Sequence, residues 1–191
     1  MGRVREFSED EVLDRAMSVF WRQGFEASSI DDLVAASGIN RGSMYAAFGD
    51  KRGLFLAVLD RYLSHVNSHR AALLTADRPA LDCLRAFFDS LVGSGAERSL
   101  GCLVTNTLTE VAPSDPEIAK KLSASLTKIE GLFAATIRRG QREGDIRRDR
   151  DARALARLLL GVAQGMRVLA RAGAAPDMLR DIAGQTIATL N

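Results

Sequence analysis

Residues 25–56 restrict the fold more than any other part of this chain, because they carry the signals of short helices separated by abrupt stops. The serine pair 28–29 can cap a helix, since each serine is followed three residues later by an aspartate. Gly38 predicts the end of that helix, because glycine adopts the left-handed backbone conformation at little cost. Asn40 can then cap a second short helix over 41–48. This pattern predicts a helix-turn-helix, a motif whose second helix enters the DNA major groove.

The remainder of the chain predicts further helices and no strand. Apolar residues recur at helical spacing, and proline, glycine and capping residues separate the apolar segments. We therefore predict an all-α chain, with a three-helix helix-turn-helix domain at its N-terminus and a helical domain at its C-terminus. A turn is expected over 140–145. The nine expected helices cover residues 8–23, 30–37, 41–48, 51–75, 80–92, 102–111, 116–139, 151–172 and 176–190.

Composition places this chain among ordinary globular proteins. Its 191 residues and 47% hydrophobic content permit a sizeable core. No apolar run is long enough to cross a bilayer, and the first residues lack the apolar core of a signal peptide, so we expect a cytoplasmic protein without membrane contact. Cys83 and Cys102 have no metal-ligand spacing and no disulfide framework. His65 and His69 lie four residues apart without a recognisable third ligand, so no metal and no cofactor are expected.

The charge of the first 55 residues does not by itself predict a nucleic-acid partner. They hold seven basic and nine acidic side chains, which gives a net charge of −2. The acidic residues gather at the starts of the first two helices, where they favour the helix dipole. The basic residues lie in the N-terminal arm, the third helix and the start of the fourth. DNA binding would depend on this local segregation.

Three short motifs, over 24–29, 38–45 and 48–54, identify a family. Together they closely resemble the DNA-binding domain of tetracycline-repressor-like (TetR/AcrR) transcription factors. The resemblance implies an all-helical homodimer with an N-terminal DNA-binding domain and a C-terminal effector pocket. It places the DNA-binding domain at 1–50 and the effector-binding and dimerisation domain at 51–191, joined through the helix at 51–75.

Several side chains are candidate DNA contacts. Arg41 and Ser43 lie early in the second helix of the motif, where arginine can bond guanine and serine can reach a base or a phosphate. Gly42 permits close approach, and the Tyr45 hydroxyl can meet a phosphate. The resemblance assigns backbone contacts to Ser29 and Lys51, at helix starts that attract phosphate. The remaining candidates are two arginines that form a flexible arm for the minor groove or a solvated tail: Arg3 and Arg5.

Residues 101–107, Gly-Cys-Leu-Val-Thr-Asn-Thr, form a second recognisable motif. A similar Gly-Cys-Leu run opens the sixth helix in a subset of the family, next to the effector cavity. A helix N-terminus lowers the pKa of a thiol, which makes Cys102 a candidate sensor of oxidants or electrophiles. The alternative, a small buried apolar residue, is the reading we favour for Cys102 and more strongly for Cys83.

A mostly apolar effector pocket with a few polar anchors is expected between the fifth and eighth helices. Ordinary packing between helices is the alternative for each of its residues. The pocket would be lined by Phe87, Phe88, Cys102, Asn106, Phe133 and Met166.

The last two helices predict a dimer interface, because they carry more apolar surface than one small domain needs. Gly161 and Gly165 would permit close approach of the partner. The expected interface residues are Leu155, Leu158, Leu159, Val162, Met166, Leu169, Leu179, Ile182 and Ile187.

The expected function is transcriptional repression, released from a palindromic operator by a small-molecule or oxidant effector. One alternative is a constitutive or architectural DNA-binding protein without an effector. The other is a helical enzyme that uses Cys102 or the histidine pair. The sequence contains no constellation of a nucleophile and a base, so an enzyme is not expected.

Overall fold

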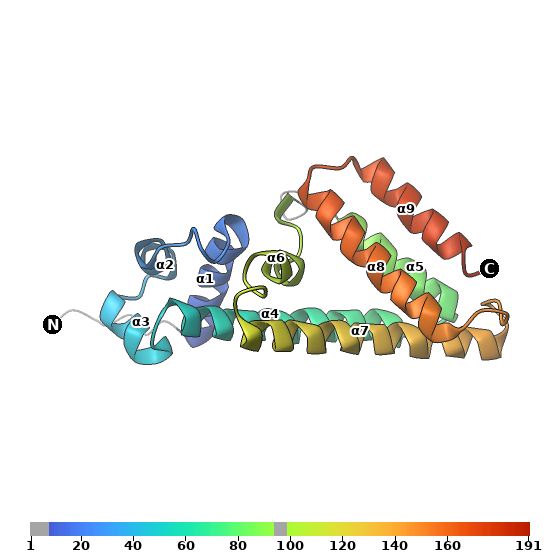
Figure 1. Ribbon diagram of the computed structural model, residues 1–191, viewed down its shortest axis with the longest axis horizontal. Helices are drawn as coiled ribbons and strands as arrows, with labels where there is room; N and C mark the ends of the chain where they lie inside the picture. The colour runs from blue at the N-terminus through green and yellow to red at the C-terminus, as the bar shows by residue number, and fades with distance from the viewer. Residues whose placement is uncertain (1–7, 94–98) are drawn as a thin grey trace.

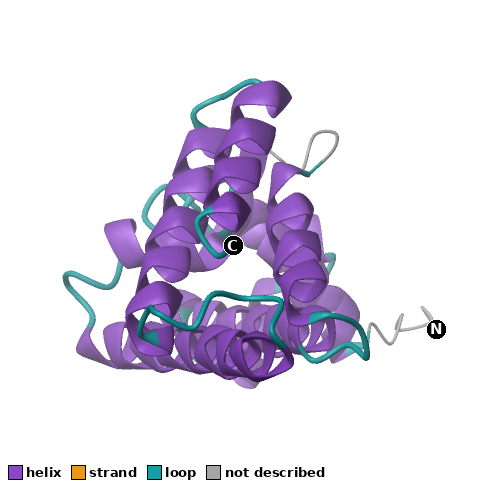
Figure 2. Ribbon diagram, turned by 90° about the vertical axis from the view of Figure 1, so that its right-hand side faces the viewer, coloured by secondary structure: helices purple, strands orange, loops and turns teal. Residues whose placement is uncertain are grey.

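A computed structural model describes residues 8–93 and 99–191. Within these ranges the chain forms nine α-helices and no strand (Figure 2), which confirms the predicted all-α class. The helices are α1 (Glu9–Gln23), α2 (Ile30–Ser37), α3 (Arg41–Phe48), α4 (Lys51–Leu74), α5 (Ala80–Val92), α6 (Leu103–Glu110), α7 (Pro116–Glu143), α8 (Ala152–Arg171) and α9 (Pro176–Ala188).

Side-chain caps define the starts of the first four helices, as their sequences predict. The Ser8 hydroxyl accepts a hydrogen bond from the backbone N–H of Glu11, and Ser29 forms a capping box with Asp32. Asn40 begins α3 and Asp50 begins α4 in the same way. Each cap satisfies a backbone donor that a helix start leaves without a partner. Between α2 and α3, Gly38 has a φ of 76°, in the left-handed region.

The predicted end of α7 near Arg139 is wrong, because this helix continues to Glu143. Gly140 lies inside it and is buried. A Cβ atom at this position would come within 2.7 Å of the Ile146 side chain. Glycine is therefore needed for close packing rather than for a turn. The stop itself lies at Gly144, whose φ of 92° is left-handed.

Two long helices form the spine of the molecule. In Figure 1, α4 and α7 lie side by side along the longest axis. The helix-turn-helix bundle of α1, α2 and α3 covers one end, and α5, α8 and α9 cover the other. Between the two groups, α6 lies above α4. None of the described helices combines the length and apolar character needed to cross a bilayer.

The core consists of two clusters that share α4 and α7. The first half of α4 contributes Phe55 and Val58 to a cluster with the helix-turn-helix, and Leu74 near its end joins the second cluster. The first cluster also takes in Leu103 of α6 and Ile118 of α7. The helix-turn-helix thus shares a continuous core cluster with α6 and α7, and its helix contacts toward them run through α4.

Candidate nucleic-acid interface and the adjoining cavity

Only one residue of α3, Met44, is buried. It anchors the helix in the first core cluster, while Tyr45 remains 43% exposed. A helix with so little buried surface offers most of its side chains to a partner. The exposed residues include the predicted contacts and two alanines that sequence reasoning did not include: Arg41, Gly42, Ser43, Tyr45, Ala46 and Ala47. The sequence could have indicated Ala46 and Ala47, because they lie one helical turn beyond Gly42 and Ser43 on the same face. An alanine methyl group can contact the methyl group of thymine.

The guanidinium of Arg41 is paired with the Asp31 carboxylate of α2. The hydrogen bond and the charge of Asp31 raise the pKa of Arg41. Both side chains are more than half exposed, so the pair lies in solvent. Asp31 engages one nitrogen of the guanidinium, so the pair competes with the expected DNA contact of Arg41 for that nitrogen and places a negative charge beside it.

The hydroxyl group of Ser29 is engaged, as donor and as acceptor, in capping the N-terminus of α2. This hydroxyl accepts from the Asp32 backbone N–H at 3.0 Å and donates to the Asp32 carboxylate at 2.7 Å. The hydrogen bond from the Ser29 hydroxyl, followed by the one from the Ser29 backbone N–H, lowers the pKa of the Asp32 carboxyl. Ser29 remains exposed, and a phosphate at this helix start would meet the same donors.

Lys51 has a role that the sequence did not predict. Its ammonium donates to the backbone carbonyls of Phe25, Glu26 and Ser28 at 2.9, 3.4 and 3.1 Å. It also lies 4.4 Å from the centre of the Phe25 ring. Three carbonyls occupy its three donors. In this structure Lys51 holds the segment that leads into α2, and its expected phosphate contact stays a prediction.

Arg3 and Arg5 lie outside the described residues, so their expected role as a minor-groove arm remains a prediction. The structure does show the partners of two acidic residues of α1. Arg61 of α4 bonds the carboxylates of Asp10 and Asp14 at 2.5 and 2.6 Å. This pairing offsets part of the negative charge that the first 55 residues carry.

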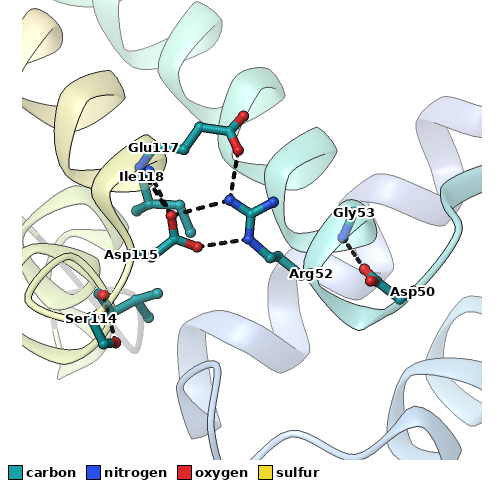
Figure 3. Close-up of polar contacts among 8 residues, drawn as sticks. Asp50, Arg52, Gly53, Ser114, Asp115, Glu117 and Ile118 are labelled. Carbon is teal, nitrogen blue, oxygen red and sulfur yellow. Dashed lines mark hydrogen bonds and ion pairs between the residues drawn. The ribbon is translucent and has the colours of Figure 1, made fainter.

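The start of α4 is tied to the start of α7 (Figure 3). Arg52 donates to both carboxylate oxygens of Asp115 at 2.7 and 3.1 Å, and to Glu117 at 2.6 Å. Asp115 also caps α7 through the backbone N–H of Ile118. The Arg52 hydrogen bond is the largest of several influences that lower the pKa of Asp115 to about 2.

A second connection runs through α6. Its last residue, Glu110, accepts a hydrogen bond of 2.9 Å from the backbone N–H of Glu26, in the segment before α2. Its N-cap residue is Cys102, and Thr105 bonds Gln164 of α8 at 2.7 Å. A single short helix therefore contacts the DNA-binding region at one end and the C-terminal helices at the other.

A cavity of about 390 Å³ lies beside the start of α6. Its walls come from α1, α4, α5, α8 and the segment before α6. The lining residues are Trp21, Tyr62, His65, Val66, His69, Ser90, Leu91, Gly93, Gly101, Arg167 and Ala170. Within the described residues, no three His, Cys, Asp or Glu side chains gather in a way that could hold a metal ion.

Cys102 is buried behind this cavity in a strongly polar setting. The Tyr62 hydroxyl donates to its sulfur at 3.4 Å, and a nitrogen of Arg70 lies 4.0 Å away. Burial raises the pKa of the thiol, but Arg167, the Tyr62 hydroxyl, Arg70 and the Thr105 backbone outweigh it and lower the pKa to about 7. Cys102 is buried in the first core cluster, as the favoured interpretation of a small buried residue expects. Its polar neighbours also stabilise a thiolate, which the candidate sensor would need. Cys83 is buried in the core as expected.

The residues predicted to form the pocket do not line the cavity. Phe87, Phe88 and Phe133 pack on one another, with Phe87 and Phe133 ring centres 4.9 Å apart. Met166 is buried in the same cluster, and Asn106 donates to the carbonyl of Leu100. These residues therefore take part in ordinary packing between helices, which was the alternative. The observed cavity lies nearer α1 and α4 than the predicted pocket did.

The predicted dimer surface divides into two faces. Five of its residues are buried within their own subunit, because α8 must cover α5 and α7: Leu155, Leu159, Met166, Leu179 and Ile187. Leu158 is 49% exposed, and Val162 and Ile182 line a groove between α8 and α9. Gly161 and Gly165 are exposed beside them. The second apolar stripe of α8 is therefore the part available to a partner.

An exposed second helix in a helix-turn-helix, joined by α4 to a larger helical domain with a cavity, defines a two-domain helix-turn-helix regulator. The profile of bacterial regulatory proteins of the tetR family matches residues 12–58, and that of the tetracyclin repressor-like C-terminal domain matches residues 80–185. The chain therefore belongs to the TetR family of transcriptional regulators.

Relatives match along the whole chain. The HTH-type transcriptional repressor ComR of Escherichia coli (strain K12) is 34% identical over 97% of this chain and 90% of its own length. An uncharacterized HTH-type transcriptional regulator of Bacillus subtilis (strain 168), YezE, is 32% identical over 100% of both chains. A cysteine mutant of the TetR family regulator CifR, complexed with 26-base-pair double-strand operator DNA, is 31% identical, with a TM-score of 0.85 and 100% coverage of both chains.

Proposed function

We propose that this protein is a homodimeric repressor that binds a palindromic operator through α3 and releases it when an effector reaches the cavity beside Cys102. The observation that carries the proposal is the exposure of α3, whose Met44 alone is buried. The repressor name of ComR and the operator complex of CifR support it. Such a protein acts on DNA, and we place it in the cytoplasm as a regulator rather than an enzyme.

The dimer is supported by the exposed stripe of α8. Leu158, Gly161, Val162 and Gly165 follow one another at helical spacing, and Ile182 of α9 lies beside them. A two-fold interface would set two copies of α3 about 34–36 Å apart, one turn of DNA. Leu158→Asp should give a monomer by light scattering, while Arg157→Asp, at an exposed neighbouring position, should leave the dimer intact. A monomeric wild-type protein would remove this part of the proposal.

The switch is supported by the two ends of α6. A ligand or a modification at Cys102 would displace the N-terminal end of this helix. Glu110 at its other end would carry the displacement to Glu26 and the start of α2. A rigid helix transmits such a shift over its whole length, and α4 offers a parallel route through Arg52. Ligand binding and operator binding would then be coupled.

The coupling can be tested with an electrophile such as N-ethylmaleimide. Fluorescence anisotropy would measure operator affinity before and after alkylation, in the wild type and in Cys102→Ser. We expect alkylation to weaken operator binding in the wild type and to leave Cys102→Ser unchanged. Unchanged affinity in both proteins would favour a constitutive DNA-binding protein. A reversible effector must also bind operator-bound protein more weakly, by the same factor, because linkage is reciprocal.

A further inference from the structure

The cavity wall contains hydrogen-bond donors without acceptors. Trp21 Nε1, Arg167 Nε, and Nε and Nη1 of Arg70 are buried and have no hydrogen-bond partner among the described residues. Trp21 and Arg167 line the cavity, and Arg70 lies behind it, next to Cys102. A buried donor without an acceptor costs free energy, and a cluster of them calls for an acceptor that the chain itself does not supply.

Arg70 is the single charged residue among the buried polar side chains of the described chain, with 3% of its surface exposed. The groups that act on its charge are Arg167, Cys102 and Tyr62. Burial and the neighbouring Arg167 both lower the pKa of Arg70. By contrast, Arg41, Arg61 and Arg157 are paired with carboxylates. A thiolate at Cys102 can offset at most one of the two positive charges.

We propose that the cavity binds a small organic anion, a carboxylate on an apolar body, as the effector of this repressor. The carboxylate would lie against Arg167 and Trp21, with Arg70 behind them. Because the unpartnered nitrogens are themselves buried in the wall, these side chains would turn toward the anion as it binds and donate to it the hydrogen bonds that they now lack. The apolar body would lie against Val66, Leu91 and Ala170. A volume of about 390 Å³ suits a molecule of this kind. The inference rests on the proposed function, because it names the chemical class of its ligand.

The experiment uses the one tryptophan of the chain, which lines the cavity, as a reporter. The probes are 4-phenylbutyrate and its neutral amide, 4-phenylbutanamide, titrated up to millimolar concentration against free protein. We expect the acid to change Trp21 emission saturably and to raise the melting temperature. The amide should bind at least about tenfold more weakly, which corresponds to the loss of one charge-assisted hydrogen bond.

Variants separate binding from folding. Arg167→Met should lose the preference for the acid, and Arg157→Gln, an exposed control on the same helix, should keep it. Arg70→Met should also lose the preference while its melting temperature rises, because the variant removes a buried charge that the fold does not compensate. If Arg70 had only a structural role, the Arg70→Met substitution would lower the melting temperature instead.

Equal affinities for the acid and the amide would overturn the proposal, as would the absence of any saturable response to the acid. Retention of the preference in Arg70→Met and Arg167→Met would also overturn it. These measurements use free protein without DNA. Their failure therefore leaves operator binding and its release by an electrophile intact. Anion binding without any effect on operator affinity would overturn the role of the anion as effector.

Discussion

Arg52, the second residue of α4, bonds both carboxylate oxygens of Asp115, the N-cap of α7. The pair joins the helix that leaves the DNA-binding region to the long helix that crosses the C-terminal domain (Figure 3). Such a fork-to-fork contact fixes the relative orientation of its two helices more tightly than a single hydrogen bond would. In the proposed switch, this contact would belong to the path along which an effector moves α3.

The Arg52–Asp115 pair should contribute stability that depends on pH. The folded-state pKa of Asp115, about 2, lies below the value of 3.8 expected for an unfolded chain. The contribution is thus complete above pH 3.8 and is lost as the pH falls towards 2. Thermal denaturation should show a gap in melting temperature between the wild type and Asp115→Asn that narrows over this interval. Asp82→Asn, in an exposed pair with Arg85, is the control, and a gap independent of pH would contradict the prediction.

Arg41 and Asp31 should have opposite effects on DNA binding. Arg41→Ala should weaken binding to the specific operator by roughly tenfold to a hundredfold and blur its sequence preference, since a base contact is lost. Asp31→Asn should strengthen binding, because it frees Arg41 and removes a negative charge near the phosphates. Anisotropy titrations on operator and random DNA would measure both effects. Equal losses on the two DNAs for Arg41→Ala would place this arginine on the backbone instead.

Lys51→Met should lower the free energy of unfolding by about 1–2 kcal/mol, because three backbone carbonyls lose a charged donor. Operator affinity should fall as α2 loses its support, with no change in the dependence of affinity on salt. A phosphate contact would instead reduce the salt slope by about one. Lys128→Met, an exposed lysine of α7, controls for the loss of charge. A reduced slope in Lys51→Met alone would restore the role that the family resemblance implies.

Cys102 should react as a thiolate at neutral pH. In a Cys83→Ala background, the rate of alkylation by iodoacetamide should rise with pH around a midpoint of about 7, the pKa of the thiol. Arg167→Met should move the midpoint upward, because this guanidinium stabilises the thiolate, and Arg157→Gln should not move it. The corresponding stability is present above the unfolded value of 9.0 and is lost as the pH falls through 7. A midpoint unaffected by Arg167→Met would contradict this account.

Two helical glycines should respond oppositely to alanine. Gly131→Ala should raise the free energy of unfolding by about 0.5–1 kcal/mol, since the site is open and alanine favours helix. Gly53→Ala should lower it by about 1–3 kcal/mol, because the new Cβ would overlap the Phe48 carbonyl oxygen and the backbone must shift. Urea denaturation would measure both. Stabilisation by Gly53→Ala would show that α3 and α4 are less closely packed than described.

Local signals were sufficient for much of the fold. The caps at Ser29, Asn40 and Asp50 depend on residues three positions away, so the sequence predicts them directly. The end of α7 was misjudged because Gly140 serves a contact with Ile146 that no helical period reveals.

The site was harder to predict, because its chemistry depends on residues far apart in the chain. Nothing near Cys102 in the sequence shows that Arg70 and Arg167 lie beside it. The ammonium of Lys51 likewise donates to carbonyls of the segment 25–28, which lie within hydrogen-bond distance but more than twenty positions earlier in the sequence. The candidate contacts Arg41, Ser43 and Tyr45 of α3 were read from the local motif alone, and all three are exposed in the structure.

The shallow anchoring of α3 also bears on how such regulators diverge. Since Met44 alone is buried, six of its eight positions can change without disturbing the core: Arg41, Gly42, Ser43, Tyr45, Ala46 and Ala47. In the proposed function, a new operator preference would therefore arise by substitutions on this face that leave the core packing unchanged. Operator specificity would then evolve independently of the helical scaffold that presents α3.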